Sequence, residues 1–132
     1  MELYHLSHKE NLNILIPKIP ETAVFEYEDT VTPRVCFSNS IDNCLASLAS
    51  IGKYYVYVAK NIDNTCLYKP SKDKVMDVDI THELWALNPI NVVCIGVIMC
   101  EGIRQLRPFK IDRDPYTIYY REYYWKWLEK YY

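Results

Sequence analysis

Short segments rich in β-branched and aromatic residues follow one another closely through the middle of the chain, and each predicts a strand. They occupy residues 54–59, 65–68, 75–80, 83–87 and 91–99, after two earlier candidates at residues 2–6 and 34–37. Two parallel strands that lie side by side need a crossover connection of a dozen or more residues, and most connections between the predicted strands are shorter. The sequence therefore predicts a sheet that is mainly antiparallel. The segment 8–33 has three prolines and no clear period, so we expect it to be irregular.

Two segments have a helical pattern instead. Residues 41–48 place apolar side chains on one helical face, Ser38 or Ser40 can cap its start, and Gly52 suits its end. In the tail, Asp114-Pro115 is a typical helix start. The residues that would share a face after it are Tyr120, Tyr124, Trp127, Leu128 and Tyr131. We therefore expect an α+β fold: a split, mainly antiparallel sheet, one short internal helix and an aromatic C-terminal helix over residues 114–132.

Composition limits the classes of protein that fit. A chain of 132 residues, half of them hydrophobic, predicts one domain over residues 1–132 with a substantial core. The net charge of -2 makes a nucleic-acid partner unfavourable, because such partners usually need a basic face. The longest apolar run, residues 92–100, is far shorter than the roughly 20 residues that span a bilayer, and no secretory signal is visible. We expect a cytoplasmic protein without a membrane partner.

The five cysteines do not form a recognisable framework. Their number is odd and no CxxC pair occurs. Cys36, Cys94 and Cys100 lie in apolar runs, where a free cysteine behaves as a small hydrophobic residue. The sequence therefore predicts reduced thiols and no metal site.

Three short motifs point to a function. The first is Leu3-Tyr4-His5-Leu6-Ser7, the second Arg34-Val35-Cys36-Phe37-Ser38-Asn39-Ser40, and the third Glu83-Leu84-Trp85-Ala86-Leu87-Asn88-Pro89. In this order they resemble the active-site motifs of the ADP-ribosyltransferases of the His-Tyr-Glu type, over most of residues 3–99. The small enzymes of this kind are used by phages and bacteria against host or rival proteins. The resemblance implies the fold of the PARP and diphtheria-toxin enzymes.

The resemblance also implies roles for individual residues. His5 would hydrogen-bond the nicotinamide ribose of NAD, and Glu83 would bind the ribose 2′-OH and stabilise the cationic transition state. Further contacts to NAD would come from Leu6, Ser7, Phe37 and Ser38. The family's tyrosine that stacks on nicotinamide has no clean counterpart, and either Phe37 or Tyr27 could supply that ring. NAD would be the substrate and no metal would be required. His5 and Glu83 should then lie on neighbouring central strands and face one cleft.

This chemistry is physically reasonable for these residue types. Breaking the nicotinamide–ribose bond builds positive charge on the sugar, which a fixed carboxylate stabilises more in the transition state than in the ground state. A neutral histidine can orient a ribose hydroxyl. Each residue also has a structural interpretation. His5 can be a satisfied core histidine, Glu83 a solvated residue at a strand edge, and Ser38 or Ser40 a helix cap.

A different class of function fits the tail. Its many rings exceed what one helical face can bury, and exposed Tyr and Trp are common at interfaces. The chain could therefore be a non-enzymatic binding or inhibitor module, such as a phage anti-defence protein, acting through this aromatic surface. In either case we expect a protein target or partner, and self-association through the tail is possible. A phage-encoded protein of this kind would act in the host cytoplasm. RNA 2′-phosphotransfer ranks lower, because few basic residues are available for a cleft.

Overall fold

The computed structural model describes residues 2–20, 29, 31–48, 50–59, 62, 67–71, 82–106 and 120–131. Within these ranges the chain forms eight strands and one helix, arranged in two antiparallel sheets. No helix in these ranges is long and apolar enough to cross a membrane.

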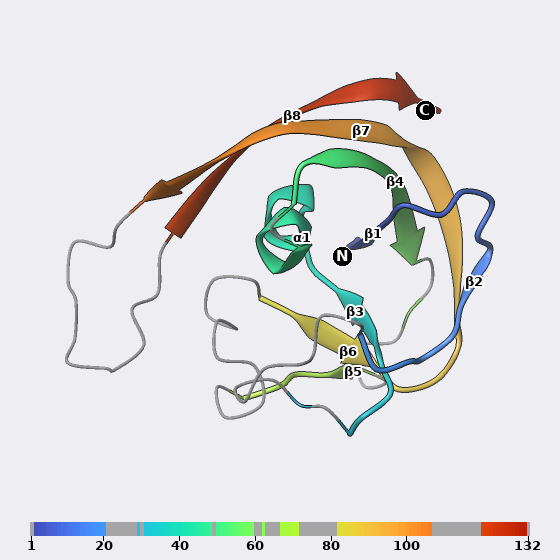
Figure 1. The fold of residues 1–132 in the computed structure, drawn as a ribbon. Coiled ribbons are helices and arrows are strands. Elements are labelled where there is room, and N and C mark those ends of the chain that lie inside the picture. The colour runs from blue at the N-terminus through green and yellow to red at the C-terminus, as the bar shows by residue number, and fades with distance from the viewer. Residues whose placement is uncertain are drawn as a thin grey trace, which may run out of the picture.

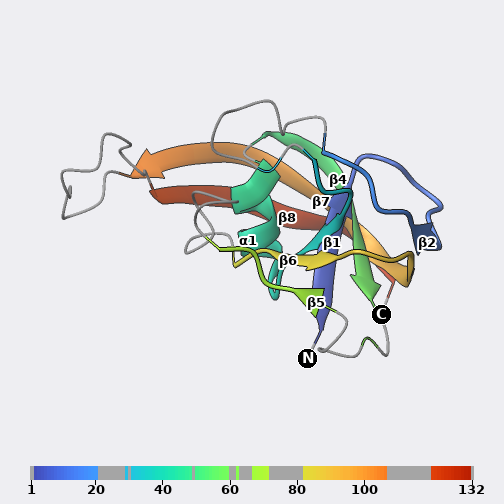
Figure 2. The same cartoon turned by 90° about the horizontal axis from the view of Figure 1, so that it is seen from below.

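The larger sheet contains five strands and is organised around one long strand, β7 (Ile90–Leu106). β7 pairs on one side with β4 (Gly52–Ala59), which in turn pairs with β1 (Leu3–Ser7). On its other side it pairs first with β2 (Ile14–Leu15) and then with β8 (Tyr120–Lys130). Figure 1 shows β7 curving over the helix α1 (Ile41–Leu48) and down one side of the molecule. β7 and β8 run side by side past α1 (Figure 2).

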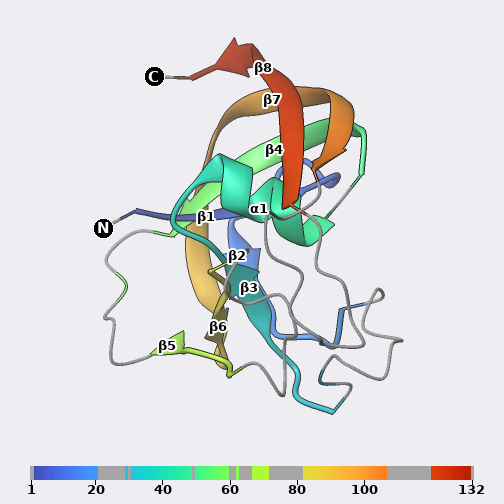
Figure 3. The same ribbon diagram turned by 90° about the vertical axis from the view of Figure 1, so that its left-hand side faces the viewer.

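The smaller sheet has the order β3 (Val35–Phe37), β6 (Leu84–Ala86) and β5 (Leu67–Tyr68). It is joined to the larger sheet where Tyr4 of β1 and Ser38, at the end of β3, exchange two backbone hydrogen bonds of 2.8 and 3.0 Å. β1, β3 and β6 therefore lie next to one another in that order. Figure 3 shows β3 and β6 below β1 and α1.

Most buried side chains fall into two clusters, and Trp85 forms a small third one with Cys36. Both faces of β4 take part in the two large clusters because its residues alternate between them. Tyr57 and Ala59 belong to a cluster between the two sheets. Tyr54 and Val56, on the opposite face of β4, pack against α1. The other buried members are Leu3, Leu15, Val35, Phe37, Ala86 and Val92 in the first cluster, and Leu6, Ile41, Cys44, Leu45, Ile98 and Cys100 in the second.

The internal helix agrees with its sequence signals in most respects. The Ser40 hydroxyl accepts from the backbone N–H of Asn43 at 3.1 Å, so Ser40 is the capping residue. Ile41, Cys44 and Leu45 are buried on the predicted face. Gly52 does not end the helix, since it is the first residue of β4.

The predicted C-terminal helix is wrong. Residues 120–130 form strand β8, and residues 114–119 lie outside the described part of the chain. The expected α+β fold of the ADP-ribosyltransferase type is wrong with it, because the described chain is mostly antiparallel β-sheet with a single short helix.

The side chains of β8 show why the helical period was misleading. Tyr123, Trp125 and Trp127 are half-buried against the cluster under α1, and the residues between them are exposed, which is the two-residue period of a strand. A helix over these residues would have placed Glu122 and Lys126 one turn apart on the same face. Lys126 instead pairs with Glu101 of β7, at 2.8 Å.

The other predicted strands agree better with the structure. Predicted strands 34–37, 54–59 and 83–87 correspond to β3, β4 and β6, and 65–68 contains β5. β7 includes the predicted residues 91–99 but continues to Leu106. The predicted strand 75–80 lies outside the described residues. The segment 8–33 contains β2 and a backbone bridge between Lys18 and Arg34.

Candidate functional site

His5 lies in the middle of β1 and is fixed by a backbone contact from β3. Its Nδ1–H donates to the carbonyl oxygen of Cys36 at 2.8 Å, and its ring meets that of Phe37 edge-on, with 6.0 Å between centroids. Burial lowers the pKa of His5 below 6.5, although the hydrogen bond to Cys36 opposes this. His5 is therefore neutral near pH 7. With the proton on Nδ1, its Nε2 is left as an acceptor.

Glu83 immediately precedes β6 and is held by the strand that it introduces. The indole N–H of Trp85 donates to Glu83 Oε1 at 2.9 Å. The preceding residue, His82, has φ of 51°, an uncommon conformation for a residue other than glycine, and it turns the chain into β6. Trp85 is fully buried and pairs with Cys36 across the ladder of β3 and β6. The carboxylate is thus fixed by a rigid neighbour on one side.

Cys36 lies between the two predicted catalytic residues. Its carbonyl accepts the hydrogen bond of His5, and its thiol lies against the carboxylate of Glu83. Burial, together with the negative charge of Glu83, raises the pKa of this thiol well above its usual value. Cys36 therefore stays protonated and is unsuited to act as a nucleophile. His5 contacts this residue from β1, and Glu83 contacts it from the position immediately before β6. They do not lie on neighbouring strands as expected, because β3 separates β1 from β6.

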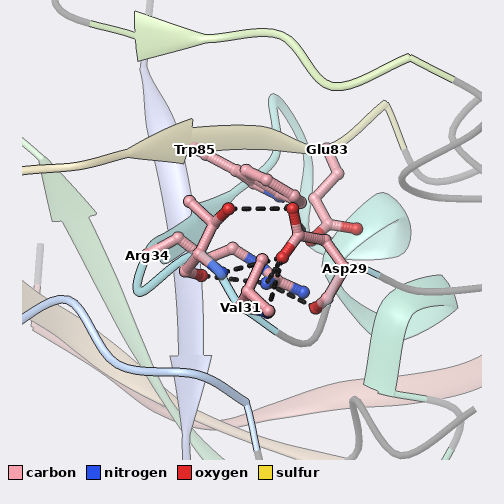
Figure 4. Close-up of polar contacts among 6 residues, drawn as sticks. Asp29, Val31, Arg34, Glu83 and Trp85 are labelled. Atoms are coloured by element: carbon pink, nitrogen blue, oxygen red, sulfur yellow. Dashed lines mark hydrogen bonds and ion pairs between the residues drawn. The ribbon is translucent and has the colours of Figure 1, made fainter.

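A buried arginine, Arg34, packs against Trp85, the residue that holds Glu83 (Figure 4). The guanidinium of Arg34 lies 4.1 Å from the centre of the Trp85 ring. Its Nη1 donates to the carbonyl oxygens of Asp29 at 2.8 Å and Thr32 at 3.0 Å, and lies 3.8 Å from the Asp29 carboxylate. The side chains of Arg34 and Asp29 are only 1% and 7% exposed. Among the described residues, the Nε atom of Arg34 has no hydrogen-bond partner.

Asp29 organises the turn that leads to Arg34. Its Oδ1 accepts from the backbone N–H groups of Val31 and Thr32, each at 2.8 Å, and its Oδ2 accepts from the Thr32 hydroxyl, also at 2.8 Å. The bond from Val31, the bonds from Thr32 and the charge of Arg34 lower the pKa of Asp29 to about 2. A chain of contacts therefore runs from Asp29 through Arg34 and Trp85 to Glu83.

The remaining predicted contacts to NAD have different positions. Phe37 is 1% exposed and lies in the core, so its ring is not available to a ligand on the surface. Ser38 is buried, with its backbone committed to the bridge with Tyr4. Leu6 belongs to the cluster under α1, and the half-buried Ser7 accepts from the backbone N–H of Lys9. Tyr27 lies outside the described residues.

Sequence reasoning did not assign roles to Asp29, Arg34 or Trp85. A weak signal was present, because Asp29 and Thr32 have the spacing of a side-chain-capped turn, and Arg34 interrupts the start of a strand. The stacking of Arg34 on Trp85 joins residues from two separate motifs, and no local pattern reports that contact.

Comparison of the chain with protein-family models, with curated proteins and with solved structures finds no match. Within the described ranges, no group of three or more His, Cys, Asp or Glu side chains is placed to hold a metal ion. The four cysteines in those ranges, Cys36, Cys44, Cys94 and Cys100, are free thiols.

Proposed function

We propose that the protein is an NAD-dependent mono-ADP-ribosyltransferase that modifies a host or rival macromolecule and releases nicotinamide. The observation that carries the proposal is that His5 and Glu83 each contact Cys36, His5 at its backbone carbonyl and Glu83 at its thiol, with the Glu83 carboxylate oriented by the indole of Trp85. The three motifs that suggested this chemistry supply the three adjacent strands β1, β3 and β6. The macromolecular target is a protein, and the reaction takes place in the cytoplasm, that of the host if a phage encodes the chain.

In this reaction the bond between the ribose C1′ and the nicotinamide nitrogen breaks, and the nitrogen keeps the electron pair. The acceptor forms a new bond to C1′ and loses its proton to solvent. Glu83 carries the negative charge that stabilises the cationic ribose in between. The Nε2 atom of neutral His5 accepts a hydrogen bond from a ribose hydroxyl and so fixes the sugar.

Purified protein incubated with NAD tests the proposal, because water can replace the unknown acceptor and nicotinamide release can be measured directly. Glu83→Gln removes the charge but keeps an oxygen that can accept from Trp85. We expect NAD binding and the fold to be retained, while turnover falls by a factor of about 10² to 10³, or about 3–4 kcal/mol. Glu10→Gln, at an exposed carboxylate that accepts from Tyr55, is the matched control and should turn over like the parent.

His5→Ala should act differently from Glu83→Gln. It removes the group that orients the ribose, so we expect the affinity for NAD to fall together with the rate. A parent protein that neither binds NAD nor releases nicotinamide would contradict the enzymatic proposal. Equal turnover by parent and Glu83→Gln would show that Glu83 is not the catalytic carboxylate.

A second candidate is a binding or inhibitor module that acts through its aromatic surface. It is favoured by the burial of Phe37, which leaves the described surface near His5 without that stacking ring. It is also favoured by the exposure of Tyr124 and Leu128 on β8. Calorimetric titration with NAD distinguishes the two candidates, because a binding module of this kind takes up no NAD. Such a module also binds its protein partner whether or not Glu83 is replaced.

A further inference from the structure

The facing pair of Cys36 and Trp85 forms the centre of a polar cluster on one face of the smaller sheet. The two residues lie directly opposite each other on β3 and β6. Arg34 precedes Cys36 by two residues and Glu83 precedes Trp85 by two, so alternation along the strands puts all four side chains on that face. Because the strands are antiparallel, Arg34 and Glu83 extend the pair at opposite ends. Cys36 therefore lies between a buried cation and a carboxylate.

The contacts of the cluster agree with this arrangement. Cys36 packs on Trp85, and the Arg34 guanidinium lies 4.1 Å from the centre of the Trp85 ring. The thiol of Cys36 contacts both the guanidinium of Arg34 and the carboxylate of Glu83. A positive charge on one side and a negative charge on the other orient the S–H dipole, with its proton towards Glu83. The thiol is thus placed as a hydrogen-bond donor to that carboxylate.

The protonation state of Cys36 fits the role of a donor. Burial and the negative charge of Glu83 raise the pKa of the thiol well above its usual value, and together they outweigh the positive charge of Arg34. The proton needed for donation is therefore retained near pH 7. Cys44 also lies in the field of Glu83, but its thiol donates to the backbone carbonyl of Tyr4 at 3.2 Å. Cys36 is therefore the thiol that is available to Glu83.

Glu83 consequently has two donors, one from each member of the facing pair. The indole N–H of Trp85 donates to it at 2.9 Å, and the S–H of Cys36 is the second donor. Hydrogen bonds to ionised groups are stronger than those between neutral groups, so even a thiol contributes to the orientation of the carboxylate. Among the described residues, the salt bridge of Arg34 is with Asp29. The carboxylate is therefore held in place without losing its charge to a salt bridge with Arg34.

We propose that Cys36 is a positioning residue for Glu83: its thiol donates a hydrogen bond to the carboxylate and, together with the Trp85 indole, fixes the direction in which the charge points. Cys36 then acts on the reaction only through Glu83, so its replacement changes the rate of turnover and leaves the affinity for NAD nearly unchanged. This consequence rests on the proposed function. The hydrogen bond itself does not, because it can be observed in the free protein.

Infrared spectroscopy tests the hydrogen bond, because the S–H stretching band falls in frequency when the thiol donates to an acceptor. The difference spectrum between the parent and Cys36→Ser identifies the Cys36 band. Glu83→Gln replaces the anion by a neutral amide, a weaker acceptor, so this band should move to higher frequency. The band of Cys94, whose thiol donates to the Gly96 carbonyl at 3.5 Å, is the control and should not move. If Glu83→Gln does not fold by circular dichroism, Glu83→Asp, which draws the carboxylate away from the thiol, should shift the band in the same direction. A Cys36 band that the substitution of Glu83 leaves unchanged overturns the proposal.

Turnover tests the positioning role. Cys36→Ala removes the donor, and nicotinamide release should fall by about tenfold while the affinity for NAD changes by less than about twofold. Cys36→Ser keeps a donor of similar size and should restore turnover to near that of the parent. Cys94→Ala, at the other half-buried thiol, is the matched control and should turn over like the parent. Equal turnover by Cys36→Ala and the parent contradicts the positioning role. A parent that does not turn over NAD contradicts the proposed function, and the infrared shift then decides the hydrogen bond by itself.

Discussion

At the scale of single residues, the fold depends on a cation that is held away from water. Arg34 is enclosed by two carbonyl oxygens, the carboxylate of Asp29 and the face of Trp85. A buried charge of this kind is tolerated only while its partners remain, because removing one partner leaves the other group buried where water cannot solvate it.

We therefore expect Arg34→Ala to lower the free energy of unfolding by about 3–5 kcal/mol, since it removes the buried guanidinium together with its two hydrogen bonds to carbonyl oxygens and its contact with the Trp85 ring. Urea unfolding followed by tryptophan fluorescence measures the change. Lys53→Ala is a suitable control because Lys53 is exposed over the ring of Tyr55, and its loss should cost less than about 0.5 kcal/mol. Similar costs for the two variants would show that the Arg34 cluster contributes little.

Trp85 should affect catalysis through its indole N–H group, which holds Glu83. Trp85→Phe keeps a ring under Arg34 but removes the N–H that donates to Glu83, which should cost about 1 kcal/mol of stability. Because Glu83 then loses its fixed orientation, nicotinamide release should fall by about tenfold while the affinity for NAD changes little. Trp125→Phe removes an indole N–H that donates to Asp42 of α1, and turnover should not respond to that change. Equal turnover by both variants would mean that the indole does not position Glu83.

At the scale of elements, the junction of β7 and β8 depends on glycine at a single position. Gly96 has φ of +153°, and a Cβ added there would lie 2.4 Å from the carbonyl oxygen of Glu129 and 2.7 Å from a ring carbon of Trp127. The carbonyl belongs to the paired backbone and cannot move without disturbing the ladder. The Trp127 ring therefore packs on β7 only because residue 96 has no side chain.

Gly96→Ala should consequently lower the free energy of unfolding by about 1–3 kcal/mol, as overpacking and backbone strain do. Gly102→Ala, in the same strand, offers a matched comparison. Its added Cβ would meet only a side-chain atom of Tyr124, at 3.3 Å, so its cost should be clearly smaller. Chemical unfolding of both variants decides the point, and equal costs would contradict the steric explanation.

At the scale of the whole molecule, stability should fall in acid in two stages. Burial lowers the pKa of His5. Below about pH 6.5 the unfolded chain therefore takes up a proton that the folded chain does not, and the free energy of unfolding decreases. The folded pKa of Asp29 is about 2, against 3.8 when unperturbed. The contribution of Asp29 to the free energy of unfolding is therefore complete above about pH 4 and is lost as the pH falls towards 2.

Urea unfolding between pH 8 and pH 2 measures both stages. His5→Asn should flatten the upper stage and leave the lower one, whereas Asp29→Asn should do the reverse. If the parent and His5→Asn lose stability equally between pH 6.5 and pH 5, the buried histidine is not the cause of the upper stage.

Local patterns in the sequence determined the elements whose signals act within a few residues. The helix over residues 41–48 and the strands β3, β4 and β6 follow from side-chain period, and a hydroxyl at Ser40 caps the helix. The motifs also pointed to His5 and Glu83, which the fold brings to the same residue, Cys36. That they come from β1 and β6 with β3 between them depended on strand order, which local patterns do not report.

Tertiary structure alone decided β8 and the buried cluster behind Glu83. Where almost every position is aromatic or long and amphipathic, as in residues 120–131, apolar side chains satisfy a helical period and a strand period equally well. Backbone pairing with β7, and the space for Trp125 and Trp127 against α1, selected the strand. Arg34 likewise became a core residue only when β6 brought Trp85 over its guanidinium, because the cost of burying a charge is set by partners from distant parts of the chain.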